Sequence, residues 1–345
     1  MSDCFAIGTK VVGPGAPVFV IAEIGINHEG SAEKCAEMIH AAGNAGADAI
    51  KLQTVDADIA YAPSSPSYEL FKRSALRREE TAAMFALARE LGMVPLTTIV
   101  DEPTLDWIRN LKPDCFKVSS GLLSNTPFIS RLACDGKPLI MSTGLGEVGD
   151  IEAAVSAIDG RVPFALLQCT SLYPCPDEEV NLAAIQHLAK RWSCVTGYSD
   201  HSRDCLPSVL SVMEGAAIVE KHFTLDQKRA GFDHAVSAEP DAFKEMVCQI
   251  RRAETLKGSG RLEMSASLQT NKALYSRCVV ALKDLSKGTL LDDKCIGIRR
   301  PNPGNRGAAP EDMCWMVGRV LQRSVKAFDG VILKDTSSAF GNEDD

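Results

Sequence analysis

Amine, hydroxyl, imidazole and carboxyl side chains recur in seven short motifs along the first two thirds of the chain. Each motif lies at or just beyond the end of a short apolar run, where parallel strands present side chains at a shared edge. Any one of these residues has an ordinary structural explanation, but their joint placement favours an active site. The motifs are AEIGINHEG (22–30, with Glu23), KLQT (51–54, with Lys51 and Gln53), KVSSG (117–121, with Lys117 and Ser120), STG (142–144, with Ser142), CTSLYP (169–174, with Ser171 and Tyr173), SDH (199–201, with Ser199 and His201) and EKHFT (220–224, with His222).

Two lysines stand out in this set, because hydroxyl donors accompany them at the ends of other apolar runs. Two ammonium groups with several hydroxyl and backbone N–H donors suit a phosphate and a carboxylate at the same time. Phosphoenolpyruvate carries both anions on one small molecule. The sequence therefore predicts a phosphoenolpyruvate site made by Lys51, Lys117, Ser120, Ser142 and Ser199.

Two histidines end consecutive runs, at His201 and His222. A lone histidine is more often structural, but two imidazoles on adjacent strand ends can approach one ion. Two imidazole ligands completed by oxygen ligands or water fit Mn, Fe, Co or Zn better than Ca. We therefore predict a divalent metal site at this pair.

Glu23 lies within an apolar run, where an unpaired carboxylate would be costly. It is expected to bond a strand-end lysine or a substrate hydroxyl, and it could take part in proton transfer. A purely structural buried Glu–Lys pair is the alternative interpretation of this residue.

The elements that must position these residues alternate in a regular way between residues 18 and 258. Eight short runs rich in valine, isoleucine and leucine alternate with eight helical segments, which predicts a (β/α)8 TIM barrel with its site at the carboxyl ends of the strands. A doubly wound open sheet is less favoured, since no G-x-G-x-x-G follows the first run. The predicted strands are 18–24, 49–53, 94–99, 115–118, 139–142, 164–168, 194–198 and 217–220, and the predicted helices are 31–45, 79–91, 103–111, 125–134, 147–158, 182–191, 205–214 and 240–256.

The composition changes after the last predicted helix. Small and polar residues predict a linker over 259–276, which would follow a barrel domain of residues 1–258. Short β-rich runs and turn signals then predict a small β-rich domain over 277–340. Its predicted strands are 278–282, 296–299, 317–320, 324–325 and 331–333.

The bulk properties exclude several classes of function. A net charge of −8 disfavours a nucleic-acid partner, and no apolar run is long enough to span a membrane. The first residues lack a secretory pattern, so the protein is expected in the cytoplasm. The 12 cysteines are scattered without a C-x-x-C pair, which favours small buried side chains over disulfides or a zinc site.

The seven motifs, in this order and spacing, resemble those of the sialic acid synthase family. The RRP sequence at 299–301 lies within a region similar to the antifreeze-like (SAF) domain of that family. The resemblance extends from about residue 18 to 335. It implies condensation of phosphoenolpyruvate with an N-acyl amino sugar, N-acetylmannosamine or a related aldehyde, to give a sialic-acid-type nonulosonic acid and phosphate.

The resemblance also implies roles for particular residues. Lys51, Lys117 and the three serines would hold phosphoenolpyruvate, while His201 and His222 would bind the metal, with Mn expected and Mg or Co as alternatives. Glu23, Lys51, Lys117 and His222 would act in catalysis. The family is also one of domain-swapped homodimers, in which an arginine matching Arg300 reaches the sugar in the partner's barrel. The sugar would further contact Gln53, Ser171, Tyr173 and Asp233.

The chain departs from the family pattern at Leu122 and Ser171. The family often has an acidic residue at the position of Leu122, where it meets sugar hydroxyls. A leucine there predicts a less hydroxylated substrate, such as a 2,4-diacetamido-trideoxyhexose leading to a legionaminic or pseudaminic type of product. A different enzyme class, a Schiff-base aldolase using Lys117 or Lys221, would leave both histidines without a role. A non-enzymatic binding protein is disfavoured by the polar residues at the strand ends.

Overall fold

The computed structural model describes residues 4–339, which divide after Ser259 into two compact units. Each unit is described by itself. The predicted domain ends at residues 1–3 and at residue 340 lie outside the described residues. Of the helices in the described part of the chain, none has both the length and the apolarity that crossing a membrane requires.

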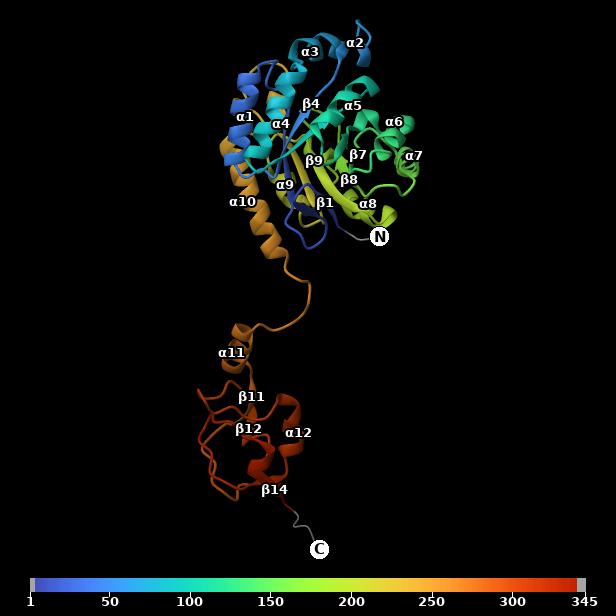
Figure 1. The fold of residues 1–345 in the computed structure, drawn as a ribbon. Helices are drawn as coiled ribbons and strands as arrows, with labels where there is room; N and C mark the ends of the chain where they lie inside the picture. Colours follow the sequence, from blue (N-terminus) through green and yellow to red (C-terminus); the bar gives the residue numbers. More distant parts are fainter. Residues whose placement is uncertain (1–3, 340–345) are drawn as a thin grey trace. The chain divides into compact units, whose positions relative to one another are not determined.

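The first unit is a closed barrel of parallel strands with helices around it, which confirms the predicted (β/α)8 fold (Figure 1). The barrel order is β10-β3-β4-β5-β6-β7-β8-β9. Its strands are β3 (Phe19–Gly25), β4 (Ala49–Gln53), β5 (Val94–Thr98), β6 (Phe116–Val118), β7 (Leu139–Ser142), β8 (Phe164–Cys169), β9 (Val195–Asp200) and β10 (Ile218–His222). The eight predicted helices are present in the structure as α1 (Ala32–Asn44), α4 (Arg78–Glu90), α5 (Glu102–Ile108), α6 (Thr126–Ala133), α7 (Val148–Ile158), α8 (Ala184–Trp192), α9 (Leu206–Ser211) and α10 (Pro240–Lys257).

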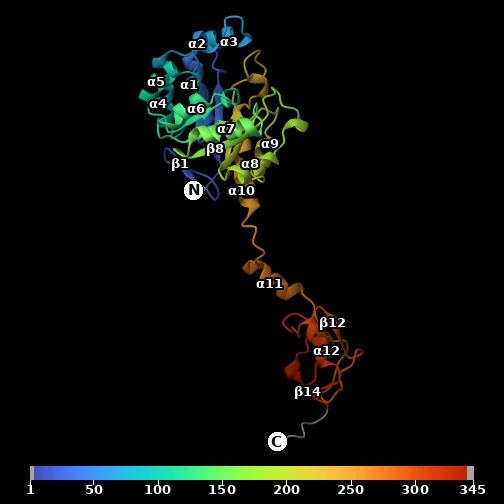
Figure 2. The same ribbon diagram turned by 90° about the vertical axis from the view of Figure 1, so that its right-hand side faces the viewer.

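Four elements of this unit are absent from the predicted set. A hairpin of β1 (Phe5–Ile7) and β2 (Lys10–Val12) precedes the barrel, and α2 (Ala57–Ala60) and α3 (Pro66–Ser74) follow β4. In both views α2 and α3 lie at one end of the barrel, and β1 lies at the other (Figures 1 and 2). Helices α2 and α3 therefore lie at the carboxyl ends of the barrel strands.

The inward side chains change character along each strand. At the start of the strands, Phe19, Ile21, Ala49 and Ile140 belong to one buried apolar cluster. Two residues further along these strands, the side chains that point to the barrel interior are polar. Residues two apart share a face because side chains on a strand alternate between its two faces. The outward side chains of the strands pack against the helices in two further apolar clusters.

The N-terminal hairpin closes the apolar end of the barrel. Ile7 and Val12 are fully buried and belong to the same cluster as the inward residues Phe19 and Ile21. Lys10 of the hairpin also forms an ion pair of 2.9 Å with Asp48, which immediately precedes β4.

The second unit has its own small apolar core. It contains β11 (Cys278–Ala281), β12 (Ile296–Arg299), β13 (Arg319–Leu321) and β14 (Thr336–Ser338), arranged as two antiparallel pairs, with the short helix α12 (Met313–Met316). The predicted strand at 331–333 is wrong, since a 3-10 turn begins at Leu333, and Val325 makes only an isolated bridge with Leu285.

The predicted linker is not entirely irregular. Helix α11 (Ala266–Tyr275) occupies its second half, with Ser265 accepting a hydrogen bond from the Leu268 amide as an N-cap. The small and polar composition concealed this helix, because Ser, Thr and Asn are weak helix formers in the interior of a helix but serve as caps.

Candidate active site

A cavity of about 510 Å³ lies at the carboxyl ends of the barrel strands. This size is typical of small-molecule sites. All twelve barrel residues that were predicted for the site line this cavity. They are Glu23, Lys51, Gln53, Lys117, Ser120, Ser142, Ser171, Tyr173, Ser199, His201, His222 and Asp233. Seven strands and the loops after them thus converge on one space.

Lys51 lies between two carboxylates on the floor of the cavity. Its Nζ is 3.1 Å from Glu23 Oε1 and 3.4 Å from Glu220 Oε1, and all three side chains are buried. Burial by itself would lower the pKa of Lys51, but Glu220 and Glu23 hold it above its usual value. Lys51 is therefore a permanent cation at this depth.

Lys117 is the second buried cation. Its Nζ donates to Ser142 Oγ at 2.7 Å and lies 3.6 Å from Glu220 Oε1. Burial lowers the pKa of Lys117, and the attraction of Glu220 offsets only part of this effect. Ser199 Oγ donates to Glu220 Oε1 at 3.1 Å, so the carboxylate is held between two lysines and a hydroxyl.

Glu23 has a different protonation behaviour from Glu220. Burial raises the pKa of Glu23 to about 7, although Lys51 opposes the shift. Gln53 Nε2 donates to Glu23 Oε1 at 2.8 Å, while Oε2 is buried without a hydrogen-bond partner among the described residues. A carboxyl group titrating near neutrality can both accept and return a proton.

The turn after β7 is pressed against the turns after β6 and β8. Gly144 N donates to Ser120 Oγ at 3.0 Å. A Cβ at Gly144 would lie 2.7 Å from Ser171 Oγ, 2.9 Å from Cys169 Sγ and 3.0 Å from Ser120 Oγ. Only glycine fits there, and the contact gathers two of the predicted serines at one wall.

The two histidines face each other across a short gap, with ring centroids 5.3 Å apart. His201 Nδ1 donates to the Thr170 carbonyl at 2.8 Å, and Tyr173 Oη lies 3.0 Å from His201 Nε2. Burial, then the positive charges of His201 and nearby lysines, lowers the pKa of His222 well below its usual value. The His222 ring is thus neutral at pH 7, the form in which imidazole binds a metal.

The donor set at this pair fits a divalent ion in an open site. His222 Nδ1 is buried without a hydrogen-bond partner among residues 4–339, and Asp233 Oδ2 lies 3.7 Å away. Within the same residues, no three or more His, Cys, Asp or Glu side chains are grouped so as to hold a metal by themselves. An ion at the two imidazoles would therefore take further ligands from substrate or water.

The outer wall of the cavity is aromatic and apolar. Tyr61 and Phe71, from the α2–α3 segment, have ring centroids 5.3 Å apart, and Leu70 lies beside them in the lining. Leu145 adds a side chain that is 68% exposed. This wall was not predicted, because the α2–α3 segment was absent from the predicted elements.

Leu122 does not take the position expected of it. It packs against the apolar cluster around α6 and α7, whereas Ser120 and Gly121 of the same turn line the cavity. The 3-10 turn Ser120–Leu122 directs the Ser120 side chain to the cavity and the Leu122 side chain to the apolar cluster. Leu122 is therefore not among the residues that line the cavity, and its effect on the choice of sugar stays a prediction.

Glu220 lies outside the predicted site residues, yet it contacts both lysines. The motif EKH indicates Glu220 as a partner for the neighbouring lysines, since residues two apart on a strand share a face. Arg300 belongs to the second unit, where its Nε donates to the Tyr275 carbonyl at 3.2 Å and its guanidinium lies 5.1 Å from the Tyr275 ring centre.

Comparison with known proteins gives this geometry a family. Residues 38–262 match the NeuB family, and residues 276–331 match the SAF domain. The N,N'-diacetyllegionaminic acid synthase of Legionella pneumophila is 34% identical over 93% of this chain and 95% of its own. The N-acetylneuraminate-9-phosphate synthase of Homo sapiens is 30% identical over 93% of each chain.

A solved structure agrees with these relatives. The N-acetylneuraminic acid (sialic acid) synthetase of Leptospira borgpetersenii, in complex with citrate, matches with a TM-score of 0.76 and 32% identity, over 79% of this chain and 95% of that one. The resemblance inferred from the seven motifs is confirmed: the chain belongs to the NeuB family, and it carries a C-terminal SAF domain.

Proposed function

We propose that the protein condenses phosphoenolpyruvate with the open-chain aldehyde of an N-acyl hexosamine, giving a nonulosonic acid and inorganic phosphate. The observation that carries this proposal is the meeting of two buried ammonium groups and two imidazoles in one cavity of about 510 Å³. An anionic donor and a polarised carbonyl acceptor need these two kinds of group side by side. Relatives named as synthases of such acids support the same reaction.

Phosphoenolpyruvate would bind at the floor. Lys51 and Lys117 supply the two positive charges, while Ser142, Ser199 and the Gly144–Ser120 turn supply neutral donors. Donors that are fixed before the ligand arrives need no reorganisation as charge shifts during the reaction.

His201 and His222 would hold a divalent ion, Mn²⁺ with Mg²⁺ or Co²⁺ as alternatives, and Tyr173 and Asp233 lie next to them. When bound, such an ion supplies a Lewis acid for the aldehyde oxygen. His201 keeps its Nε2 directed toward this region because its Nδ1 is bonded to the Thr170 carbonyl.

The proposed reaction makes one carbon–carbon bond and breaks the carbon–oxygen bond to phosphate. The methylene carbon of phosphoenolpyruvate forms a bond to the aldehyde carbon, whose oxygen takes a proton. Water adds its oxygen to the former enol carbon and gives up one proton. As the bond from that carbon to the phosphate oxygen breaks, the added hydroxyl becomes the carbonyl of the product and its proton leaves with the phosphate. Glu23 is placed at the floor with a pKa of about 7, so it can take a proton from the water and return it.

The sugar would occupy the outer part of the cavity, with Gln53, Ser171, Tyr173 and Asp233 as polar contacts. Tyr61, Leu70 and Phe71 form an apolar wall there, which suits the methyl groups of a 2,4-diacetamido-2,4,6-trideoxyhexose better than a hydroxyl or phosphate at its last carbon. Among the described residues that line the cavity, the lysines are Lys51 and Lys117, both at the floor. Within the described residues of the barrel, this wall offers no ammonium or guanidinium group to a sugar phosphate.

A panel assay tests the reaction class and the sugar separately. Phosphate release is measured with phosphoenolpyruvate, Mn²⁺ and one of three sugars: the diacetamido-trideoxyhexose, N-acetylmannosamine and its 6-phosphate. We expect the first to have the highest kcat/KM. A preference for either N-acetylmannosamine sugar would overturn the sugar assignment only. No turnover with any sugar, or phosphate lacking the ¹⁸O of a label placed in the enol–phosphate bridge, would overturn the reaction.

We further propose a homodimer in which Arg300 of one subunit completes the partner's site, as the family resemblance implies. The test mixes an Arg300→Ala subunit with a Lys117→Ala subunit. Partial recovery of activity supports the arrangement, and verified heterodimers without recovery contradict it. Within residues 4–339, which contain all twelve cysteines, no disulfide is formed, which supports a reaction in the reducing cytoplasm.

One observation favours a second candidate, a Schiff-base aldolase using Lys117, because burial lowers the pKa of this lysine. Borohydride trapping with pyruvate, and full activity in the presence of a chelator, would support it. Lys221 cannot serve in that role, because its Nζ is buried against the carbonyls of Ser202 and Asp204 on the outside of the barrel.

A further inference from the structure

A buried ion pair lies directly behind the two histidines. Asp200 ends β9 and Lys221 is the next-to-last residue of β10, and the two are partners in the strand register. Each immediately precedes one of the histidines, so the alternation along a strand sends it to the opposite face. Lys221 Nζ lies 3.4 Å from Asp200 Oδ1, and the two side chains are 1% and 0% exposed.

Lys221 directs its ammonium group into the turn that follows β9. Its Nζ donates to the Ser202 carbonyl at 2.7 Å and to the Asp204 carbonyl at 2.9 Å. With Asp200 as the third partner, all three N–H donors of the ammonium group are used. The turn that carries His201 is thus folded around a cation that belongs to the neighbouring strand.

Asp200 secures the same turn from its other side. Its Oδ1 accepts from the Ser202 amide at 2.8 Å and from Ser202 Oγ at 2.6 Å, and its Oδ2 accepts from Ser208 Oγ at 2.5 Å. Ser208 lies in α9, so one carboxylate connects β9, the turn and the next helix. Removing either partner leaves the other charge buried and uncompensated.

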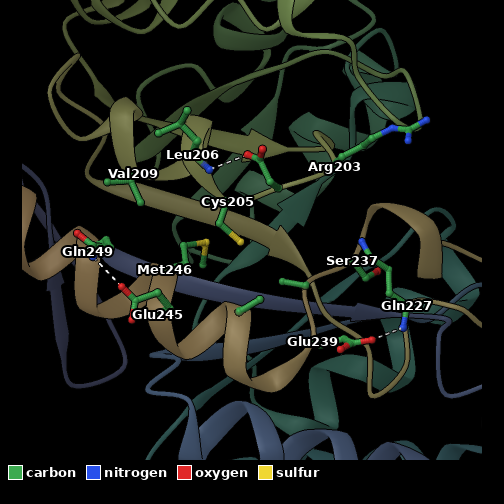
Figure 3. Close-up of a pocket in the computed structure, with 13 residues that line it drawn as sticks. Arg203, Cys205, Leu206, Val209, Gln227, Ser237, Glu239, Glu245, Met246 and Gln249 are labelled. Atoms are coloured by element: carbon green, nitrogen blue, oxygen red, sulfur yellow. Dashed lines mark hydrogen bonds between the residues drawn. The ribbon is translucent and has the colours of Figure 1, made fainter.

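Packing supports the outer side of the turn only in part, since Cys205 contacts the apolar core. Arg203, Asp204 and Cys205 line a second cavity of about 480 Å³, between the loop after β10, α9 and α10 (Figure 3). Glu239 and Met246 form part of the facing wall, and Glu239 is bonded to the Gln227 amide on its own side. A hollow thus lies beside the turn on this side, and the ion pair holds the turn from the side of the strands, together with the bond from the Cys175 amide to the His201 carbonyl.

We infer that Asp200 and Lys221 are positioning residues, which set the separation and direction of His201 and His222 by joining the two strand ends from outside the barrel. This inference rests on the proposed metal-binding role of the histidines. It assigns the pair no contact with substrate. It explains why two full charges lie in an otherwise apolar layer between the strands and α9.

The test compares the wild type with Lys221→Met and Asp200→Asn/Lys221→Met. In metal-free protein, amide hydrogen exchange is followed on peptides covering residues 198–208, which include the Ser202 amide. Mn²⁺ affinity is measured by electron paramagnetic resonance of the free ion. We expect faster exchange in this segment for Lys221→Met and a roughly 10- to 100-fold weaker Mn²⁺ affinity, as for other groups that orient metal-binding histidines.

The double variant keeps the proposal testable if Lys221→Met folds poorly, because it removes both buried charges together. It should fold, as far-UV circular dichroism would show, and should still bind Mn²⁺ more weakly than the wild type. Lys10→Met is the matched control, since it breaks the Lys10–Asp48 ion pair at the opposite end of the barrel. It should lower the unfolding temperature without changing Mn²⁺ affinity or exchange at 198–208.

The outcomes separate this inference from the proposed function. Exchange at 198–208 that is unchanged in both Lys221 variants overturns the inference, whatever the metal result. Wild-type Mn²⁺ affinity in both folded variants overturns it as well. A wild-type protein that binds no Mn²⁺ and turns over in chelator overturns the metal role in the proposed function, while the exchange data still decide whether the pair holds the turn.

Discussion

The two ends of the barrel interior are built by the same strands but have opposite compositions. Ile21, Ala49, Cys115 and Ile140 make an apolar cluster at one end with the hairpin residue Ile7. Two residues further along the same faces stand Glu23, Lys51, Lys117 and Ser142, which line the cavity at the other end. The apolar end thus contributes to the free energy of folding, while the polar end carries the charges that the proposed reaction would use. Changes at each end should therefore affect different measurements.

Lys117→Met should give the largest effect and confine it to activity. Removing one preorganised cation from the floor is expected to lower kcat/KM by roughly 10²- to 10³-fold, the size seen for single donors that stabilise developing charge. Glu220 would keep Lys51 and Ser199 as partners, so stability should change little. Phosphate-release kinetics and urea unfolding measure the two quantities. A folded variant with less than a tenfold loss would contradict the proposed role.

Ile140→Ala tests the opposite end. Ile140 is fully buried in the apolar cluster, so the substitution should lower the free energy of unfolding by about 2–5 kcal/mol. At temperatures well below the unfolding transition, kcat should stay within twofold of the wild type. Urea denaturation followed by fluorescence measures the first quantity. A large loss of kcat in the folded variant would show that the two ends are not independent.

Gly144→Ala sharpens the comparison within the polar end. The added methyl group must displace the turn from Ser120 and Ser171, which should reduce kcat/KM by roughly 10²-fold through misplacement of the donors. Gly149→Ala is the matched control, because a Cβ at Gly149 in α7 meets nothing within 4 Å. Similar kinetics for the two variants would contradict the proposed role of the turn after β7 in placing Ser120 and Ser171.

Glu23→Gln tests the stability of the polar end, and its effect on the free energy of unfolding should depend on pH. Since the folded-state pKa is raised from 4.5 to about 7, the folded protein binds more protons than the unfolded chain between these values. The contribution of Glu23 to stability is thus present at low pH, falls as pH rises through this window, and is fully lost above about 7. Its size is about 3 kcal/mol, which corresponds to the rise in pKa from 4.5 to about 7.

The measurement is the difference in free energy of unfolding between Glu23→Gln and the wild type at pH values from 4.5 to 7.5. This difference isolates Glu23 from His222, whose lowered pKa has the opposite sign of effect in part of the same range. The variant should gain stability relative to the wild type as pH rises. A flat difference would show that Glu23 keeps an ordinary pKa.

Much of the fold was predictable because the signal is periodic. Short apolar runs and helical segments alternate eight times, and the bounds of β4 and β7 agree with the prediction at both ends. The α2–α3 segment was missed because its residues, rich in serine and proline, lack an apolar stripe. The hairpin of β1 and β2 was missed because each strand has only three residues.

The site was predictable as a set of residue types, but its electrostatics were not. Lysine and histidine at strand ends are visible in the sequence, whereas the raised pKa of Glu23 comes from burial and the approach of Lys51 and Glu220. The direction of each side chain also needed the strand register. Lys221 and His222 are neighbours in sequence, yet one lies outside the barrel and the other lines the cavity.

The hairpin that closes the apolar end has a kinetic consequence for the proposed reaction. A ligand can reach Lys51 and Lys117 only from the rim, past the region where the sugar would lie. The compact donor must therefore enter before the aldehyde, and phosphate must depart after the larger product. Steady-state patterns should be those of compulsory-order addition, with phosphate competing against phosphoenolpyruvate alone.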